Sequence, residues 1–126
     1  MPFLTPLKVQ LLNDREVFPW ITLAELVYED PDTGVEYVVP KHFRTDGASI
    51  PKALVLVPVV GPTLFQRYFG QGVWQGFREG VLHDYLLRGA VKNSVAHDTF
   101  RKALTEAGYP TDLVETYYSA VKAYNP

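Results

Sequence analysis

Two His-Asp dipeptides, His83-Asp84 and His97-Asp98, occur close together in the segment VLHDYLLRGAVKNSVAHDTF, residues 81–100. Imidazole is the side chain that most readily takes up and gives off a proton near neutral pH, and a carboxylate beside it can orient it or bind a cation. Histidines and carboxylates together could also hold a transition metal. The other interpretation is structural, because buried polar side chains often satisfy one another's hydrogen bonds and brace neighbouring elements.

The two dipeptides are not equivalent, because each residue of an α-helix turns the side-chain direction by about 100°. In the second dipeptide, Ala96 and Phe100 mark the apolar side of the predicted helix, so His97 lies on the flank of that side and Asp98 points nearly away from it. We therefore predict that Asp98 faces solvent and that His97 is the member of this pair near the core.

Both side chains of the first dipeptide are predicted to lie near the core. Asp84 falls on the same side of its helix as Val81, and His83 aligns with Glu79, with which it could form an ordinary i, i+4 pair. A charged group at the edge of a core needs a partner, because leaving it desolvated and unpaired is costly. His83 and Asp84 are our candidate catalytic residues, with His83 as general base.

Two more candidates come from the segment PKHFRTDGASIPK, residues 40–52. Its turn chemistry predicts a structured loop, in which Asp46 and Ser49 could contact a substrate or brace neighbouring elements. Asp46 and His97 are also the candidate ligands of a divalent metal. Ser49 lies in GASIP and not in a GxSxG nucleophile elbow, and the chain contains no HExxH, P-loop or CxxC motif.

The composition is that of one compact domain. The chain has 126 residues, 47% of them apolar and 21% charged, and a net charge of -2, so no basic surface for nucleic acid is expected. Cysteine is absent, which excludes disulfides and thiolate chemistry. The start MPFLTPLKVQLL does not resemble a signal peptide, and no segment is apolar over the roughly 18 residues of a membrane span. We expect residues 1–126 to form one soluble domain.

The first 40 residues favour strands, because they are rich in β-branched and aromatic residues. The turn DPDTG predicts a β-hairpin over residues 20–39 in which Val35, Tyr37 and Val39 share a face. Residues 41–73 are predicted to be the structured loop and then an apolar connector, ALVLVPVVGPTLF, whose prolines do not suit a regular helix.

Residues 74–126 have the helical period. We predict three helices, from residue 74 to about 89, from an N-cap at Asn93 or Ser94 to about 107, and from 111 or 112 to about 124. The sequence thus predicts an α+β fold in which an N-terminal antiparallel β-hairpin or small sheet packs on about three C-terminal α-helices.

Four segments match a longer pattern. VPKHFRTDGASIPK, VLHDYLL, VAHDTFRKAL and YYSAVKAYN correspond, in this order, to a Phe-x-Thr-Asp-Gly-Ala-Ser-x-Pro turn, a His-Asp-Tyr-Leu helix, an Ala-Asp-x-x-Phe helix and a Tyr-x-Ala-Val helix. With this pattern, over roughly residues 36–125, the chain resembles the family of small phage and prophage proteins known as domain of unknown function 1353. The resemblance implies phage or prophage origin and carries no settled activity. In this chain the residues of the turn and of the first helix that match are Phe43, Thr45, Asp46, Gly47, Ala48, Ser49, Pro51, His83, Asp84, Tyr85 and Leu86.

The chain departs from this pattern at one position. Counting back from Phe100, His97 stands where the family pattern has Asp, and Asp98 comes one residue later. Calcium prefers carboxylate to imidazole ligands, so this replacement argues against a calcium site. The His-Asp helix also resembles, more loosely, that of secreted phospholipases A2, in which the histidine activates water and an Asp of a neighbouring helix binds calcium. This chain lacks their cysteines, and Tyr85 follows Asp84 directly.

Two classes of function remain open, and we favour the first. In the first, the chain is a non-enzymatic phage or prophage protein, either a virion component such as a tail, baseplate or connector subunit or a host-interaction protein. It would act in the virion or the host bacterial cytoplasm, with residues 53–74 as a contact surface for partners or for a homo-oligomer. In the second, the chain is a small His-Asp hydrolase of a lipid ester or cell-envelope substrate. His83 would then activate water, while Asp84, Asp46 or His97 orients it or holds a divalent metal.

Overall fold

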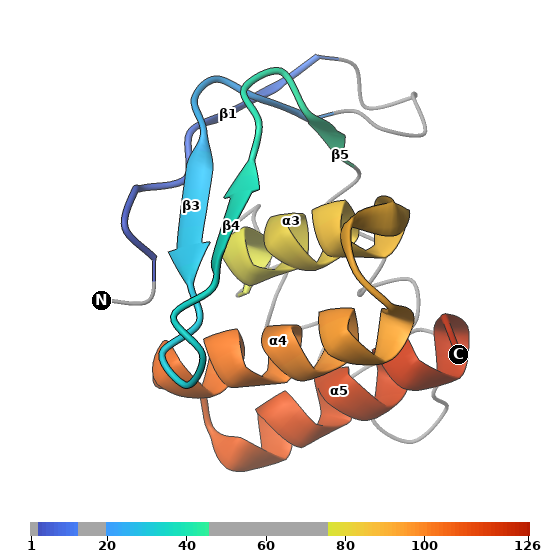
Figure 1. Ribbon diagram of the computed structural model, residues 1–126. Helices are drawn as coiled ribbons and strands as arrows, with labels where there is room; N and C mark the ends of the chain where they lie inside the picture. Colours follow the sequence, from blue (N-terminus) through green and yellow to red (C-terminus); the bar gives the residue numbers. More distant parts are fainter. Residues whose placement is uncertain (1–2, 13–19, 46–75) are drawn as a thin grey trace. The chain divides into compact units, whose positions relative to one another are not determined.

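The computed structural model describes residues 3–12, 20–45 and 76–126 (Figure 1). The chain divides into two compact units, residues 1–47 with the strands and residues 48–126 with the helices, called here the strand unit and the helix unit. Antiparallel strands come first and three helices follow, which confirms the α+β prediction. Asp46, Ser49 and the contact surface predicted over residues 53–74 lie outside the described residues, and the expectation of a single domain stays a prediction.

The strand unit contains two small antiparallel sheets. β1 (Val9–Leu11), β2 (Trp20–Thr22) and β5 (Arg44–Thr45) form one sheet in the order β1-β2-β5. β3 (Leu26–Glu29) and β4 (Glu36–Val39) form the other, a hairpin. The strands predicted in the first 40 residues are therefore present.

The hairpin closes through the predicted DPDTG turn. The Asp30 carboxylate accepts a hydrogen bond from the Asp32 amide at 2.9 Å, and the Asp30 carbonyl accepts one from the Gly34 amide at 2.7 Å. Gly34 has φ +73°, which favours glycine. Of the three residues predicted to share a face, Val39 is buried and Tyr37 half-buried, whereas Val35 precedes β4 and is 46% exposed.

The hairpin is shorter than predicted, because residues 20–22 belong to the other sheet. Thr22 is fully buried, and its hydroxyl donates to the Pro40 carbonyl and accepts from the Phe43 amide, both at 2.8 Å. The Thr22 amide also donates to the Phe43 carbonyl at 3.1 Å. These bonds hold residues 40–45 beside β2, so Arg44–Thr45, predicted as loop, form β5.

The helix unit consists of α3 (Phe77–Tyr85), which continues into a π-helical turn η1 (Leu86–Ala90), then α4 (Asn93–Glu106) and α5 (Thr111–Tyr124). α4 packs against both α3 and α5 and lies between them (Figure 1). The three helices follow the predicted ranges closely. None of the helices in the described ranges is long and apolar enough to cross a membrane.

Apolar side chains of α4 and α5 form most of the core of the helix unit. Ala107 is exposed and follows Glu106, the last residue of α4. Gly108, with φ +90°, and the bond from the Tyr109 amide to the Leu104 carbonyl make a left-handed C-terminal cap. The apolar side chains described in the helix unit that are exposed by 3% or less are Val81, Leu82, Leu86, Ala96, Phe100, Ala103, Leu104, Leu113, Val114, Tyr117, Ala120 and Val121.

The predicted cap of α4 is wrong. Lys92 is the N-cap residue and makes no side-chain capping bond, while Asn93 is already the first helical residue. The side-chain amide of Asn93 donates instead to the backbone oxygen of Pro126 at 3.3 Å. The start of α4 is thereby tied to the chain beyond α5.

We predict that Thr22→Val loosens the junction between the two sheets. Valine keeps the shape of threonine but removes the hydroxyl that accepts from the part-buried Phe43 amide, at a cost of about 2 kcal/mol. Hydrogen exchange of the Phe43 amide should become roughly 30-fold faster. Thr33→Val, which removes an exposed turn hydroxyl, is the matched control and should leave this amide unchanged. Equal effects of the two substitutions would contradict the role given to Thr22.

Candidate functional site

His83 of α3 and His97 of α4 are in direct contact. Nε2 of His83 lies 2.9 Å from Nδ1 of His97, and the ring centroids are 5.1 Å apart. His83 is 1% exposed and His97 3%. The prediction that both lie near the core is confirmed, and the structure brings them together.

The second nitrogen of His97 fixes the direction of these bonds. Nε2 of His97 lies 2.6 Å from the backbone oxygen of Asn125, which follows α5. A carbonyl oxygen only accepts hydrogen bonds, so Nε2 carries the proton and Nδ1 of the neutral ring is an acceptor. Nε2 of His83 therefore donates to Nδ1 of His97. Two successive hydrogen bonds join α3, the first turns of α4 and the end of α5.

Nδ1 of His83 is left with a lone pair. It is buried and has no hydrogen-bond partner among the described residues. The Phe100 ring packs against the His83 ring at 4.8 Å, and Tyr117 packs behind Phe100 at 6.2 Å. Burial, and secondly the neighbouring His97, lower the pKa of His83 to about 3, so this imidazole is neutral near pH 7.

The spacing of two residues on α4 explains how this helix binds the chain segment after α5. Asn93 and His97 are four residues apart and so lie on one side of the helix. From that side, Asn93 donates to the backbone oxygen of Pro126 and His97 to the carbonyl of Asn125. The last residues of the chain are thus bound to one side of the N-terminal half of α4.

The carboxylates of α3 bind arginines and not the histidines. Asp84 is 8% exposed and accepts from Nη2 of Arg88, one turn later, at 2.8 Å. Glu79 is 1% exposed and accepts from Nη2 of Arg78 at 3.1 Å. In the described part of the chain no hydrogen bond or ion pair joins Glu79 or Asp84 to His83. Asp84 is buried as predicted, but it does not orient the imidazole beside it.

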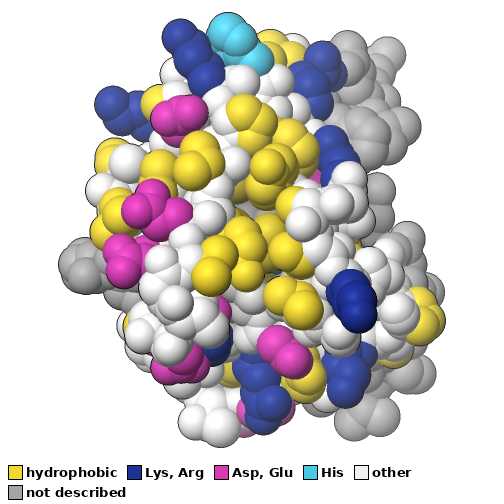
Figure 2. Space-filling model, in the orientation of Figure 1, with side chains coloured by type: hydrophobic (Ala, Val, Ile, Leu, Met, Phe, Trp, Pro, Cys, Tyr) yellow, Lys and Arg dark blue, Asp and Glu magenta, His cyan; other side chains and the backbone are white. Residues whose placement is uncertain are grey.

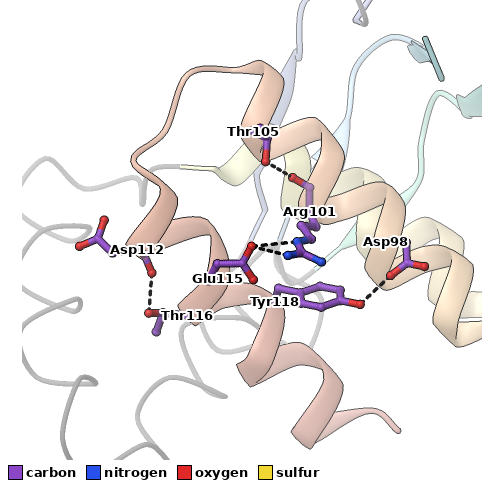
Figure 3. Close-up of polar contacts among 7 residues, drawn as sticks. All are labelled: Asp98, Arg101, Thr105, Asp112, Glu115, Thr116 and Tyr118. Carbon is purple, nitrogen blue, oxygen red and sulfur yellow. Dashed lines mark hydrogen bonds and ion pairs between the residues drawn. The ribbon is translucent and has the colours of Figure 1, made fainter. Parts of the chain in front are cut away.

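Asp98 is exposed, as its helical phase predicts. Figure 3 shows it on the α4–α5 surface, where the Tyr118 hydroxyl donates to its Oδ1 at 2.7 Å. The Arg101 guanidinium lies 4.6 Å from the centre of the Tyr118 ring and donates from Nε to Glu115 at 3.0 Å (Figure 3). Each exposed contact of this kind contributes little to the free energy of unfolding. Asp98 therefore belongs to a surface network and not to the histidine pair.

Sequence reasoning missed two groups, Asn125 and Tyr109. The group of Asn125 that binds His97 is its backbone carbonyl, which every residue has, so the residue type could not predict this contact. Tyr109, in a Gly-Tyr-Pro terminator, accepts a hydrogen bond from the amide of Gly76, the N-cap of α3, at 3.1 Å. Burial, and then the charge of Glu79, raise the pKa of the Tyr109 hydroxyl.

The described residues do not assemble a metal site. Among them, no three His, Cys, Asp or Glu side chains come together around one point. A metal on Nδ1 of His97 would displace the proton that joins the pair. His97 does donate its other N–H to a carbonyl, as metal-ligating histidines do, but Nδ1 of His83 has no such acceptor. The metal predicted at Asp46 and His97 stays a prediction, because Asp46 is not described.

Comparisons with known proteins identify relatives without a known role. A family model described as "Protein of unknown function (DUF1353)" matches residues 20–121. The chain is also 30% identical over 106 residues to the uncharacterized protein y4jT of Sinorhizobium fredii, an alignment that covers 82% of this chain and 28% of that protein. The chain thus spans little more than a quarter of that relative's length. No solved structure matches it.

We predict that the free energy of unfolding falls as the pH is lowered below 6.5. An unfolded histidine takes up its proton near pH 6.5, whereas folded His83 does so only near pH 3, so the unfolded state binds more protons between these values. The loss is about 1.4 kcal/mol per pH unit, or roughly 2 kcal/mol at pH 5. Urea denaturation followed by helical circular dichroism at pH 7.5 and pH 5 measures it.

Two variants test the assignment to His83. His83→Gln should remove most of this pH dependence, because glutamine does not titrate. His42→Asn, at an exposed histidine of the strand unit with φ 68°, should keep it. A His83→Gln protein with the wild-type slope would show that another group is responsible.

Proposed function

The chain belongs to the family described as proteins of unknown function (DUF1353), and from the geometry of its histidine pair we propose that it is a non-enzymatic binding protein. We propose, more specifically, a phage- or prophage-encoded protein that is part of the virion, as a tail, baseplate or connector subunit, or that binds a host protein in the bacterial cytoplasm. The phage setting comes from the family pattern that the sequence resembles.

The burial of the histidine pair and the hydrogen bonds within it are the observation that supports this proposal. A general base works best with a pKa near the working pH and within hydrogen-bond reach of its substrate. His83 has a pKa of about 3 and is 1% exposed, and its Nε2–H donates a hydrogen bond to His97. Asp84 is engaged with Arg88. These residues therefore serve packing better than catalysis.

The surface of the strand unit supports a binding role. Of the seven large hydrophobic residues that are exposed in the described ranges, six belong to this unit. Val38 lies opposite Val27 in the β3–β4 register, and Figure 2 shows hydrophobic side chains on the viewed face of this hairpin. Concentrated exposed apolar surface is typical of protein contacts. The six residues are Leu4, Leu11, Leu12, Leu23, Val35 and Val38.

The proposal is tested in the strain that carries the gene. Phage particles released after induction are purified, and the chain is sought in them by mass spectrometry, while chemical crosslinking identifies host proteins bound in the cytoplasm. We expect Val38→Lys to reduce incorporation or crosslinking at least tenfold, because it replaces an exposed apolar side chain of the hairpin by a charged one.

Val95→Lys is the matched control, since Val95 is 38% exposed and Val38 36%, but Val95 lies on α4. It should leave incorporation or crosslinking unchanged. A chain that is absent from the particles and crosslinks to no host protein would contradict the proposal. So would equal losses in the two variants.

A second candidate, the small hydrolase, is favoured by one observation. The Nδ1 lone pair of His83 is free while its Nε2–H is held by His97, which is how a general base is oriented by a neighbouring group. The substrate would be a lipid ester or a cell-envelope component, with Asp46, Ser49 or a divalent metal completing the site. The pKa of about 3 makes His83 a weak base near pH 7.

Activity measurements separate the two candidates. The full chain is incubated with p-nitrophenyl butyrate and with phosphatidylglycerol vesicles, each with and without calcium, manganese or zinc. We expect no turnover above the protein-free rate. Turnover that His83→Gln abolishes and His42→Asn preserves would replace the binding proposal by the hydrolase.

A further inference from the structure

The neutral histidine pair has one complete hydrogen-bond pattern. His83 donates to His97, and His97 donates to the carbonyl of Asn125. Asn93 adds a hydrogen bond from its side-chain amide to the backbone oxygen of Pro126, from the same side of α4. The chain segment after α5 is thus held by two donors of α4, and the stronger contact, at 2.6 Å, depends on how the imidazoles are protonated.

A third proton on the pair disrupts this pattern. If it goes to Nδ1 of His97, that N–H meets the N–H of His83, and the conflict is relieved only if His83 moves its own proton to Nδ1. If it goes to His83 directly, it again occupies Nδ1, which is buried and without an acceptor in the described structure. Every arrangement of three protons therefore has either two opposed N–H groups or a buried unpaired donor, and both are costly.

We propose that the His83–His97 pair is an acid-sensitive latch, which holds the segment after α5 against α4 while both rings are neutral and releases it when the pair takes up a proton. Release of the segment removes the opposition of the two N–H groups, because His97 can then turn its added N–H away from His83 and toward water. The inference concerns the helix unit alone and does not depend on the proposed binding function.

In the described ranges, the acidic side chains of α3 and α4 are paired with groups other than the two imidazoles. On α3, Glu79 and Asp84 are each ion-paired with an arginine of their own helix. On α4, Asp98 is exposed and accepts from the Tyr118 hydroxyl of α5. From α5, the side chain closest to His83 in the ring stack is Tyr117, which packs behind Phe100. Among the described residues, no carboxylate forms a hydrogen bond or an ion pair with either ring.

Nuclear magnetic resonance of the isotopically labelled full chain tests the latch. Long-range 1H–15N spectra at pH 7.5 should show both His83 and His97 with their proton on Nε2. The Asn125 amide, which donates to the Val121 carbonyl at 2.9 Å, reports release through its hydrogen-exchange protection. We expect its protection factor to fall about tenfold or more between pH 7.5 and pH 5, and to stay below that of the Phe100 amide inside α4.

Two variants distinguish the latch from general acid unfolding. In His97→Gln, the side-chain amide can accept from His83 and donate to Asn125 without titrating, so the protection of Asn125 should lose most of its pH dependence. Asn93→Ala removes the neighbouring bond to Pro126 and leaves both histidines, so the pH dependence should remain.

Three results would overturn the proposal. One is an Nδ1–H tautomer on either histidine of the wild type at pH 7.5. Another is equal protection of Asn125 and Phe100 at both pH values, which would mean that the segment leaves only when the whole helix unit unfolds. The third is the same pH dependence of Asn125 protection in His97→Gln as in the wild type.

Discussion

The hydrogen bond between two neutral imidazoles is the interaction on which the helix unit depends. It exists only because the Asn125 carbonyl fixes the proton of His97 on Nε2 and so makes Nδ1 the acceptor that His83 needs. One backbone oxygen at the end of α5 therefore determines the tautomers of side chains on α3 and α4. The same arrangement leaves the two imidazoles poorly placed for catalysis, since their hydrogen bonds join α3, α4 and the residue that follows α5. Packing of Phe100 against His83 keeps water away from the pair and makes its hydrogen bonds stronger than they would be at the surface.

Features with a local cause could be predicted from the sequence. The helices and the opposite burial of His97 and Asp98 follow from helical periodicity, and the hairpin turn follows from the conformations that proline and glycine prefer. The hairpin start at residue 20 was wrong because the Thr22 hydroxyl pairs with residues 40 and 43, a long-range choice that no residue pattern encodes. In α3, all positions from Glu79 to Asp84 are buried, so helical phase could not tell which polar side chain meets which partner.

The sequence predicted which residues of the candidate site are buried, but it did not predict their hydrogen-bond partners. His83, Asp84 and His97 are buried as expected, but the carboxylate next to His83 turns to Arg88 and the histidine from the next helix takes its place. The family pattern that the sequence resembles has Asp where this chain has His97. A carboxylate there would accept the same Nε2–H and favour a positive charge on His83, whereas an imidazole keeps the pair neutral. Relative to that pattern, His97 would replace a charged couple by an uncharged one.

The contact between Tyr109 and Gly76 has a consequence for how the chain acquires its structure. α3 has nine residues, too few for a helix to be stable alone, and the amide of its N-cap residue is bound by the hydroxyl of a residue 33 positions later, in the connection between α4 and α5. The amide at the start of α3 therefore gains this acceptor only when the connection between α4 and α5 has reached its place. We expect α3 to leave the ribosome first among the three helices and to become stable last, so the order of synthesis and the order of folding run in opposite directions.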